Sequence, residues 1–154
     1  MSTSITRSPR AGIVLVESQA LRLYQAIGAY QTRQISWLIE GLASQGFNDL
    51  TPSHVTFIAA LDCDDNIASE IARRLNLSRQ AVHKTVRELS VSGYIETIEN
   101  KKKRNSKVIQ ITGKGEELIA LARRMYAELD RKLLSENNTE DVERLIQILG
   151  KTCV

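Results

Sequence analysis

Residues 68–87 constrain the fold more than any other part of this sequence, because their apolar and polar residues fit two short helices joined by a three-residue turn. Ala72 lies four residues before Asn76, and a small side chain there lets a second helix cross the first closely. Asn76 suits the turn, since Asn adopts positive φ more readily than most non-glycine residues. We expect Leu77 to fill the core beneath the turn and Ser78 to cap the second helix. The spacing therefore predicts a helix-turn-helix.

The second helix of this pair has two chemically different sides. With Arg79 at zero and about 100° per residue, Val82, Val86 and Leu89 fall near ~300°, ~340° and ~280°, so this side should face a core. Most amphipathic surface helices have a solvated charged face that binds nothing, and that interpretation is the alternative here. The other side carries the polar and basic residues that we call the basic arc: Arg79, Gln80, His83, Lys84 and Arg87.

The residues that follow predict a β-hairpin with a basic tip. Gly93 is expected to end the helix, residues 94–99 alternate with the period of a strand, and residues 107–112 supply a second strand. A basic loop is usually solvated surface, but beside a basic recognition helix its expected role is contact with phosphates or the minor groove. This hairpin is thus predicted to be a wing, whose tip carries four consecutive cations: Lys101, Lys102, Lys103 and Arg104.

The distribution of charge says more than the total. The chain has 21 Lys and Arg against 18 Asp and Glu, a net charge of +3. Between Ile71 and Lys107 there are ten cations and three anions, so this segment carries +7 and the remainder −4. The positive field is confined to the helix-turn-helix and the wing, which points to double-stranded DNA as their partner.

Length and composition limit the class of protein. With 154 residues and 42% hydrophobic content, the chain can build one compact domain, and we expect no second one. The longest uncharged run, Leu50 to Leu61, is far shorter than a membrane span, and no signal-peptide core is present, so we expect a cytoplasmic protein that does not enter membranes. Cys63 and Cys153 give no disulfide framework or metal spacing and are expected to be free thiols.

No catalytic motif is found in the sequence. It contains no nucleophile elbow, phosphate loop, zinc-protease motif or spaced carboxylate pair with a supporting His, and there are only two histidines. We therefore expect neither an enzyme nor a cofactor.

Long helices are predicted on both sides of the winged segment. Apolar residues at helical spacing run from about Leu15 to Ser44 and again over residues 112–134, and Thr139 is expected to cap a last helix. Thr51 and Pro52 predict the start of a short helix with Phe57, Ile58 and Leu61 facing inward. Because long apolar stripes at both chain ends need covering, we predict a twofold homodimer. The alternative is a monomer whose terminal helices pack only on each other.

Several short stretches of the sequence are distinctive: Leu50-Thr51-Pro52 followed by residues 55–61, Glu70-Ile71-Ala72, Leu77-Ser78, Leu89, Gly93-Tyr94-Ile95 and Thr112-Gly113-Lys114-Gly115. With these residues and this order of elements, the sequence resembles the MarR family of bacterial winged-helix regulators from about Leu15 to Leu149. The predicted fold is mainly α with a small β-hairpin wing, as a single domain over residues 1–154: about 50–112 for the winged helix-turn-helix, and about 12–48 and 115–152 for dimerisation helices. In the wing, Lys103 and Asn105 stand where the family has Asp and Arg, so a salt bridge that would orient an arginine is missing.

The resemblance implies a homodimer that places two recognition helices in successive major grooves of a pseudo-palindromic operator, about 34 to 36 Å apart. It also implies transcriptional repression, usually relieved by a small ligand. Arg79, Gln80, His83 and Lys84, in the first turns of the recognition helix, are expected to reach base edges. Ser78, the expected cap of this helix, is counted with the DNA-binding residues. Phosphate contacts are expected from Arg73, Arg74, Arg87 and the wing cations Lys101, Lys102, Lys103 and Arg104.

The sequence suggests two further sites. Arg33, Trp37, His54 and Phe57 are candidates for lining an effector cavity, with Arg33 pairing an anionic ligand, although most such residues are packing or surface. Cys63 lies among aspartates and invites a metal or redox role. We favour a buried small residue at the end of the short helix, followed by a solvated turn.

Two other functions are compatible with a winged helix. One is a protein-contact or dimerisation module without specific DNA binding, against which the net charge of +7 on residues 71–107 argues. The other is an activator or nucleoid-type DNA binder that has no effector.

Overall fold

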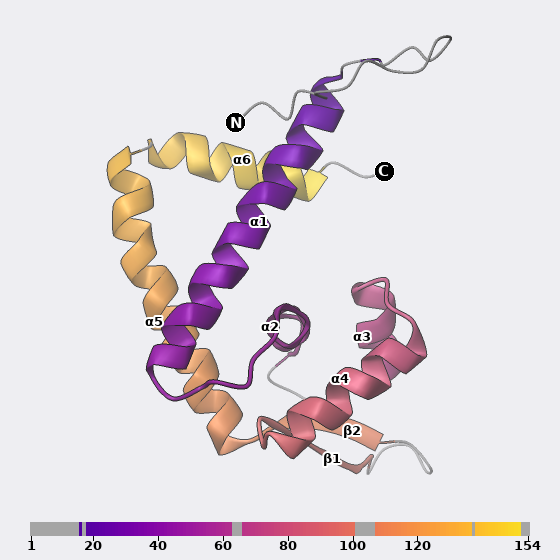
Figure 1. Ribbon diagram of the computed structural model, residues 1–154. Coiled ribbons are helices and arrows are strands. Elements are labelled where there is room, and N and C mark those ends of the chain that lie inside the picture. The colour runs from indigo at the N-terminus through magenta and orange to yellow at the C-terminus, as the bar shows by residue number, and fades with distance from the viewer. Residues whose placement is uncertain (1–15, 17, 63–65, 101–106, 137, 152–154) are drawn as a thin grey trace, which may run out of the picture. The chain divides into compact units, whose positions relative to one another are not determined.

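The computed structural model describes residues 16, 18–62, 66–100, 107–136 and 138–151 (Figure 1). The predicted fold class is confirmed: this part of the chain is mainly helical with one two-stranded antiparallel sheet. None of its helices has both the length and the apolar character needed to cross a bilayer. The elements are α1 (Gln19–Ser44), α2 (Pro52–Ala59), α3 (Ala68–Arg74), α4 (Arg79–Val91), β1 (Ile95–Glu99), β2 (Lys107–Ile111), α5 (Gly113–Glu136) and α6 (Thr139–Lys151).

The chain divides into two compact units, residues 1–34 and residues 35–154, with the division inside α1. Large apolar side chains are exposed on the part of α1 that belongs to the first unit: Leu21, Leu23, Tyr24, Ile27 and Tyr30.

The second unit contains the hydrophobic core. Every helix of this unit except α6, and both strands, contribute buried residues to it. Phe47 and Tyr94 stack with ring centroids 6.1 Å apart, which joins the loop after α1 to the end of α4. The core consists of Leu38, Leu42, Leu50, Phe57, Ile71, Ala72, Val82, Leu89, Tyr94, Ile95, Ile109 and Leu118.

In the turn between α3 and α4, the residue predicted to have positive φ does so, but the residue that packs into the core is not the predicted one. Asn76 has φ 51°, and the Leu77 N–H donates to the Ala72 carbonyl at 2.8 Å, which closes α3. The expectation that Leu77 fills the core is wrong, since 42% of Leu77 is exposed. Leu75 packs against the core instead. Leu75 still has helical geometry and lies four residues after the buried Ile71, whereas the turn at Asn76 carries Leu77 off that face.

Local side-chain caps define where three helices begin. Thr51 caps α2 as predicted, with Pro52 in its first turn, and the Ser78 hydroxyl accepts from the Ala81 N–H at 3.1 Å to cap α4. The prediction for the last helix is wrong by one residue. The Asn138 side chain accepts from the Glu140 N–H at 3.1 Å and is the cap, while Thr139 is the first helical residue.

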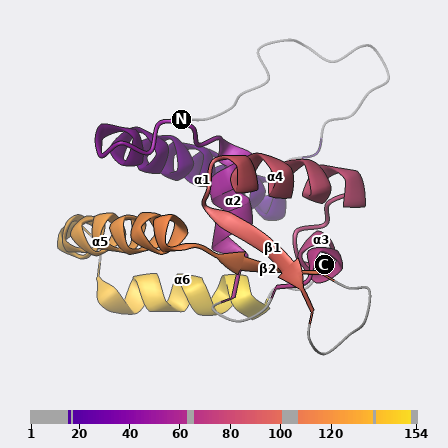
Figure 2. The ribbon, with the colours of Figure 1, turned by 90° about the horizontal axis from the view of Figure 1, so that it is seen from below.

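The hairpin packs beside α4 (Figure 2), and its register pairs Ile95 with Ile111 and Glu99 with Lys107. Asn66 extends the pairing, because its backbone exchanges hydrogen bonds with Ile109 at 3.2 and 2.8 Å just before α3 begins. The base of the wing is thereby tied to the helix-turn-helix. The basic tip, residues 101–106, lies outside the described residues.

The residues that follow α4 pack closely against the start of α5. Gly93 has φ 76°, and the Tyr94 N–H donates to the Leu89 carbonyl at 3.0 Å, which ends α4 as predicted. The Thr112 hydroxyl donates to the Gly93 carbonyl at 2.6 Å. A Cβ added to Gly115 would lie 2.2 Å from the Tyr94 carbonyl oxygen, so this close approach of α5 requires glycine.

The Tyr94 side chain extends this junction to the loop before α2. Its hydroxyl donates to Asp49 Oδ1 at 2.5 Å, and Lys114 Nζ lies 4.3 Å from the centre of its ring. Burial and the hydrogen bond to the carboxylate raise the pKa of Tyr94. Burial alone would raise the pKa of Asp49, but hydrogen bonds from Ser92 and Tyr94 outweigh it and hold that pKa below its ordinary value. The end of α4 is therefore fixed by contacts from three parts of the chain.

Candidate nucleic-acid interface

The two sides of α4 are divided as the sequence predicted. Val82 and Leu89 are buried to 1% and 0% exposure, and Thr85 beside them is also buried. The arc opposite is exposed along its whole length: Arg79, Gln80, His83, Lys84 and Arg87 are all solvent-accessible. Burial of the apolar side thus holds the helix so that its basic arc faces outward.

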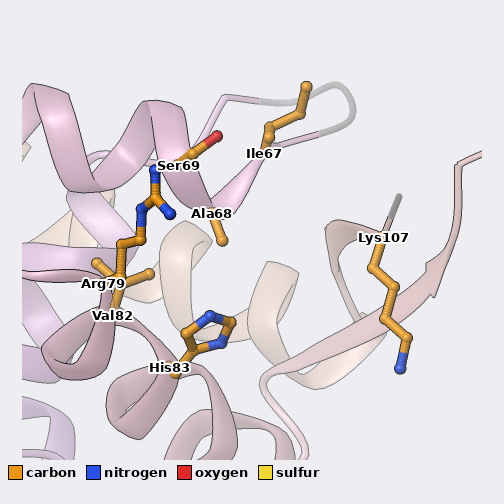
Figure 3. A pocket seen from close by; sticks show the side chains of 7 residues that line it. All are labelled: Ile67, Ala68, Ser69, Arg79, Val82, His83 and Lys107. Atoms are coloured by element: carbon orange, nitrogen blue, oxygen red, sulfur yellow. The ribbon is translucent and has the colours of Figure 1, made fainter. Parts of the chain in front are cut away.

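A hollow of about 460 Å³ lies at the start of α4 (Figure 3). Figure 3 shows Arg79 and His83 on one side of it and Lys107, the first residue of β2, on the other. Cations from α4 and from the base of the wing therefore border the same depression. A surface that binds a polyanion along its length needs cations from neighbouring elements in this way. Its remaining lining comes from Ile67, Ala68, Ser69 and Val82.

A second hollow of about 470 Å³ lies further along α4, against the N-terminus of α2. It brings Lys84 and Arg87 of the basic arc next to the hydroxyl groups of Thr51 and Ser53. Hydroxyl groups, helix N-termini and cations are the usual donors to phosphate oxygens. The other residues that line this hollow are His54, Glu88, Val91 and Ser92.

The cations predicted to hold phosphates are placed differently from one another. Arg73, in the last turn of α3, is exposed. Arg74 is exposed too, but its guanidinium donates to the Ala60 carbonyl at 2.5 Å and to Asp62 Oδ2 at 2.8 Å. The hydrogen bond and the charge of Asp62 raise the pKa of Arg74. Arg74 thus ties the end of α3 to the segment after α2, while the wing cations Lys101, Lys102, Lys103 and Arg104 lie outside the described residues.

The four residues suggested for an effector cavity lie in different environments. Phe57 is in the core, and His54 is buried at the start of α2. Trp37 packs edge-to-face on Tyr126 with centroids 5.6 Å apart. Arg33 is exposed and belongs to the first unit, whereas the other three belong to the second. An effector site at these residues stays a prediction.

Comparison with known proteins finds a family match for the part of the chain that contains the helix-turn-helix. Residues 48–104, from just before α2 to the wing, match the model of the MarR family. This segment therefore has the sequence pattern of the MarR family. No curated protein sequence matches the chain.

Solved structures of MarR-family and related regulators share the fold. A mutant of MarR from E. coli, complexed with operator DNA, is 17% identical with TM-score 0.69, and the match covers 86% of this chain and 94% of that one. A MarR/EmrR family transcriptional regulator from Acinetobacter is 20% identical with TM-score 0.68 and coverages of 88% and 94%. The transcriptional regulator BldR from Sulfolobus solfataricus is 21% identical with TM-score 0.65 and coverages of 87% and 96%. The resemblance inferred from the sequence is confirmed, with the fold shared over most of the chain.

Sequence reasoning missed two polar contacts that hold the helix-turn-helix in place. His54 Nε2 lies 3.2 Å from Glu88 Oε2, and the Tyr94 hydroxyl bonds to Asp49. The sequence gave a partial indication of the role of His54. Thr51 is followed three residues later by a side chain that can accept a hydrogen bond from the Thr51 N–H, and this spacing is that of a capping box. The partners are 34 and 45 residues apart, so the contacts themselves carry no local signal.

The described residues contain no group of three His, Cys, Asp or Glu side chains able to hold a metal ion. Cys63, for which a metal or redox role was considered, lies outside them, as does Cys153. The assignment of Cys63 as a buried structural residue stays a prediction.

Proposed function

We propose that this protein is a sequence-specific DNA-binding transcriptional regulator that acts as a homodimer on a pseudo-palindromic operator. The observation that carries the proposal is the exposed basic arc of α4, backed by a buried apolar side and bordered by Lys107 of the wing. Two of the solved structures with this fold support it: MarR from E. coli is described as complexed with operator DNA, and MepR from S. aureus as bound to an oligodeoxyribonucleotide.

In the proposed complex, α4 enters the major groove with its N-terminal turns foremost. Arg79, Gln80, His83 and Lys84 then reach base edges, where Arg favours guanine and Gln favours adenine. Arg87 and Arg73 contact phosphates, together with the cations of the wing tip. Arg74 contributes through its contact with Asp62, by holding α3 in position.

A second copy of the chain is part of the proposal, because large apolar side chains are left uncovered. On α6, Leu145 and Ile146 are 50% and 65% exposed, and Ile148 and Leu149 are exposed beside them. Uncovered apolar stripes of this size favour association. Residues 12–48 and 115–152 are proposed to form the dimer, so that two copies of α4 face successive grooves about 34 Å apart. Repression, and its release by a small ligand, follow from the family resemblance.

The deciding experiment is a titration of the purified protein against a labelled duplex from its own upstream region and against a scrambled duplex, from about 50 to 200 mM salt. We expect the native duplex to bind ~10³-fold more tightly and to show a palindromic footprint. Equal binding to both duplexes with a steep salt slope would indicate a non-specific DNA coat. Binding to neither would favour the protein-contact function.

Sedimentation at the same protein concentration tests the dimer. The proposal requires a species of twice the 17.2 kDa chain mass. A species of the chain mass itself would favour the monomer whose terminal helices pack on each other.

A further inference from the structure

His54 is buried and uses both ring nitrogens. Thr51 and His54 form a reciprocal cap at the start of α2: the His54 N–H donates to the Thr51 hydroxyl at 3.3 Å, and the Thr51 N–H donates to His54 Nδ1 at 3.3 Å. A histidine thus takes the place that Glu or Gln usually has in a capping box. Its other nitrogen, Nε2, lies 3.2 Å from Glu88 Oε2 on α4.

The cap determines which nitrogen of His54 carries the proton. Because Nδ1 accepts a hydrogen bond from a backbone N–H, the proton of the neutral ring is on Nε2. Nε2 is therefore the donor to Glu88. The start of α2 holds the imidazole in one orientation, and the imidazole holds the Glu88 carboxylate.

Glu88 is the one acidic residue of α4, and it lies beside the basic arc. Its second oxygen, Oε1, is 3.8 Å from Lys84 Nζ, one turn earlier on the helix. One carboxylate thus joins a buried histidine of α2 to a lysine proposed to reach the operator. Glu88 is 42% exposed, so its negative charge lies where an approaching DNA phosphate would be repelled.

We propose that His54 and Glu88 are positioning residues for specific DNA recognition. Their hydrogen bond sets how α4 is rotated against α2, and so the direction in which Lys84 meets the bases. Neither residue need contact DNA. This inference rests on the proposed function, since it concerns how the same surface distinguishes one DNA sequence from another.

The physical reason is that packing of the apolar side of α4 has no preferred direction, whereas a hydrogen bond has one. Val82 and Leu89 are held in the core by non-directional packing. A hydrogen bond from a buried, capped imidazole adds one directional contact on the flank that faces α2. Base readout depends on side-chain placement within a fraction of an ångström, whereas attraction to phosphates does not, so loss of the contact should lower specificity more than affinity.

Three substitutions separate this role from a merely structural one. His54→Gln keeps a side chain that can complete the capping box but removes the bond to Glu88. Glu88→Ala removes the same bond from the other side. Glu88→Gln removes the charge but keeps an amide oxygen that can accept from Nε2. Glu96→Ala is the matched control, because it removes an exposed carboxylate of β1 and leaves α4 untouched.

The measured quantity is the ratio of Kd for scrambled duplex to Kd for the native upstream duplex, with thermal unfolding of each variant at the same protein concentration. We expect His54→Gln and Glu88→Ala each to lower this ratio about tenfold, and the double variant to lower it no further. Glu88→Gln should retain most of the wild-type ratio, as the conservative variant that restores the bond. Glu96→Ala should shift both Kd values alike and leave the ratio unchanged.

Two results would overturn the inference. One is an unchanged ratio in His54→Gln and Glu88→Ala, with or without a lower melting temperature, because the pair would then only stabilise the fold. The other is a loss in Glu88→Gln equal to that in Glu88→Ala. If His54→Gln fails to fold, Glu88→Ala decides alone, since Glu88 lies outside the core. A wild-type ratio near one would refute the proposed function itself, and the inference with it.

Discussion

Replacement of Gly115 by alanine tests the junction between α4 and α5. The added Cβ would lie 2.2 Å from the Tyr94 carbonyl oxygen and 2.8 Å from Ile111 Cγ2. The first neighbour is backbone, and it already accepts a hydrogen bond from the Thr112 N–H at 3.1 Å, so it cannot yield without moving the start of the hairpin. The substitution should therefore force the two segments apart.

The size of the effect follows from two opposing contributions. Overpacking of this kind costs about 1–3 kcal/mol. Alanine in place of glycine inside a helix stabilises by up to about 1 kcal/mol. Since a 2.2 Å contact with backbone belongs at the upper end of the overpacking range, we expect a net loss of about 1–2 kcal/mol in the free energy of unfolding.

Chemical denaturation at one fixed protein concentration measures this difference, because association makes the stability of a dimer concentration-dependent. Gly113→Ala is the matched control: Gly113 also lies at the start of α5, but nothing is within 4 Å of its added Cβ. We expect Gly113→Ala to be neutral or up to about 1 kcal/mol stabilising. If Gly115→Ala proves as stable as Gly113→Ala, the argument that this junction needs glycine for its close approach is wrong.

Three further predictions concern DNA binding and pH. Arg79→Ala should lose about 1–3 kcal/mol of binding to the native duplex and relax preference at one base position, as measured by competition with single-base variants of the site. Lys102→Ala should instead weaken native and scrambled duplexes alike and flatten the plot of log Kd against log salt by about one unit, so equal behaviour of these two variants would contradict the division between base and phosphate contacts. Because the pKa of Asp49 is lowered in the folded protein, its contribution to stability is present above the unfolded value of 3.8 and is lost as pH falls through the lower folded pKa. The stability advantage of the wild type over Asp49→Asn should therefore shrink below about pH 4 in denaturation curves, and a constant difference down to pH 2 would show that the Tyr94–Asp49 hydrogen bond does not depend on the carboxylate charge.

The His54–Glu88 pair and the Gly115 junction both hold the C-terminal part of α4 and the residues that follow it. The first joins α4 to α2 partway along its length, and the second closes the chain where α4 gives way to the wing and α5. The variants at these two places should therefore differ in which property they change first, DNA specificity or stability. His54→Gln should lower DNA specificity with little loss of stability, and Gly115→Ala should lower stability first.

Much of the structure from α2 to the end of α4 was predictable from the sequence, because the contacts that decide it are local. Thr51 and Ser78 cap their helices through donors three residues away, and Asn76 and Gly93 take the positive φ values that end α3 and α4. Such contacts depend on residue type and spacing alone. The periodicity of residues 79–89 likewise divided α4 correctly into a buried side and an exposed basic arc.

Tertiary structure decided the contacts between segments that are far apart in the chain. The sequence favoured Leu77 as the core residue of the turn, but the direction of the chain after Asn76 gave that place to Leu75. Arg74 is as cationic as Arg73, and only the fold brings Asp62 to it. The partners of His54 and Tyr94 lie 34 and 45 residues away, where no periodicity reaches. Residue type and spacing thus determine where helices begin, end and face, while the choice of partner for a buried polar group depends on which surfaces the packed core brings within hydrogen-bonding distance.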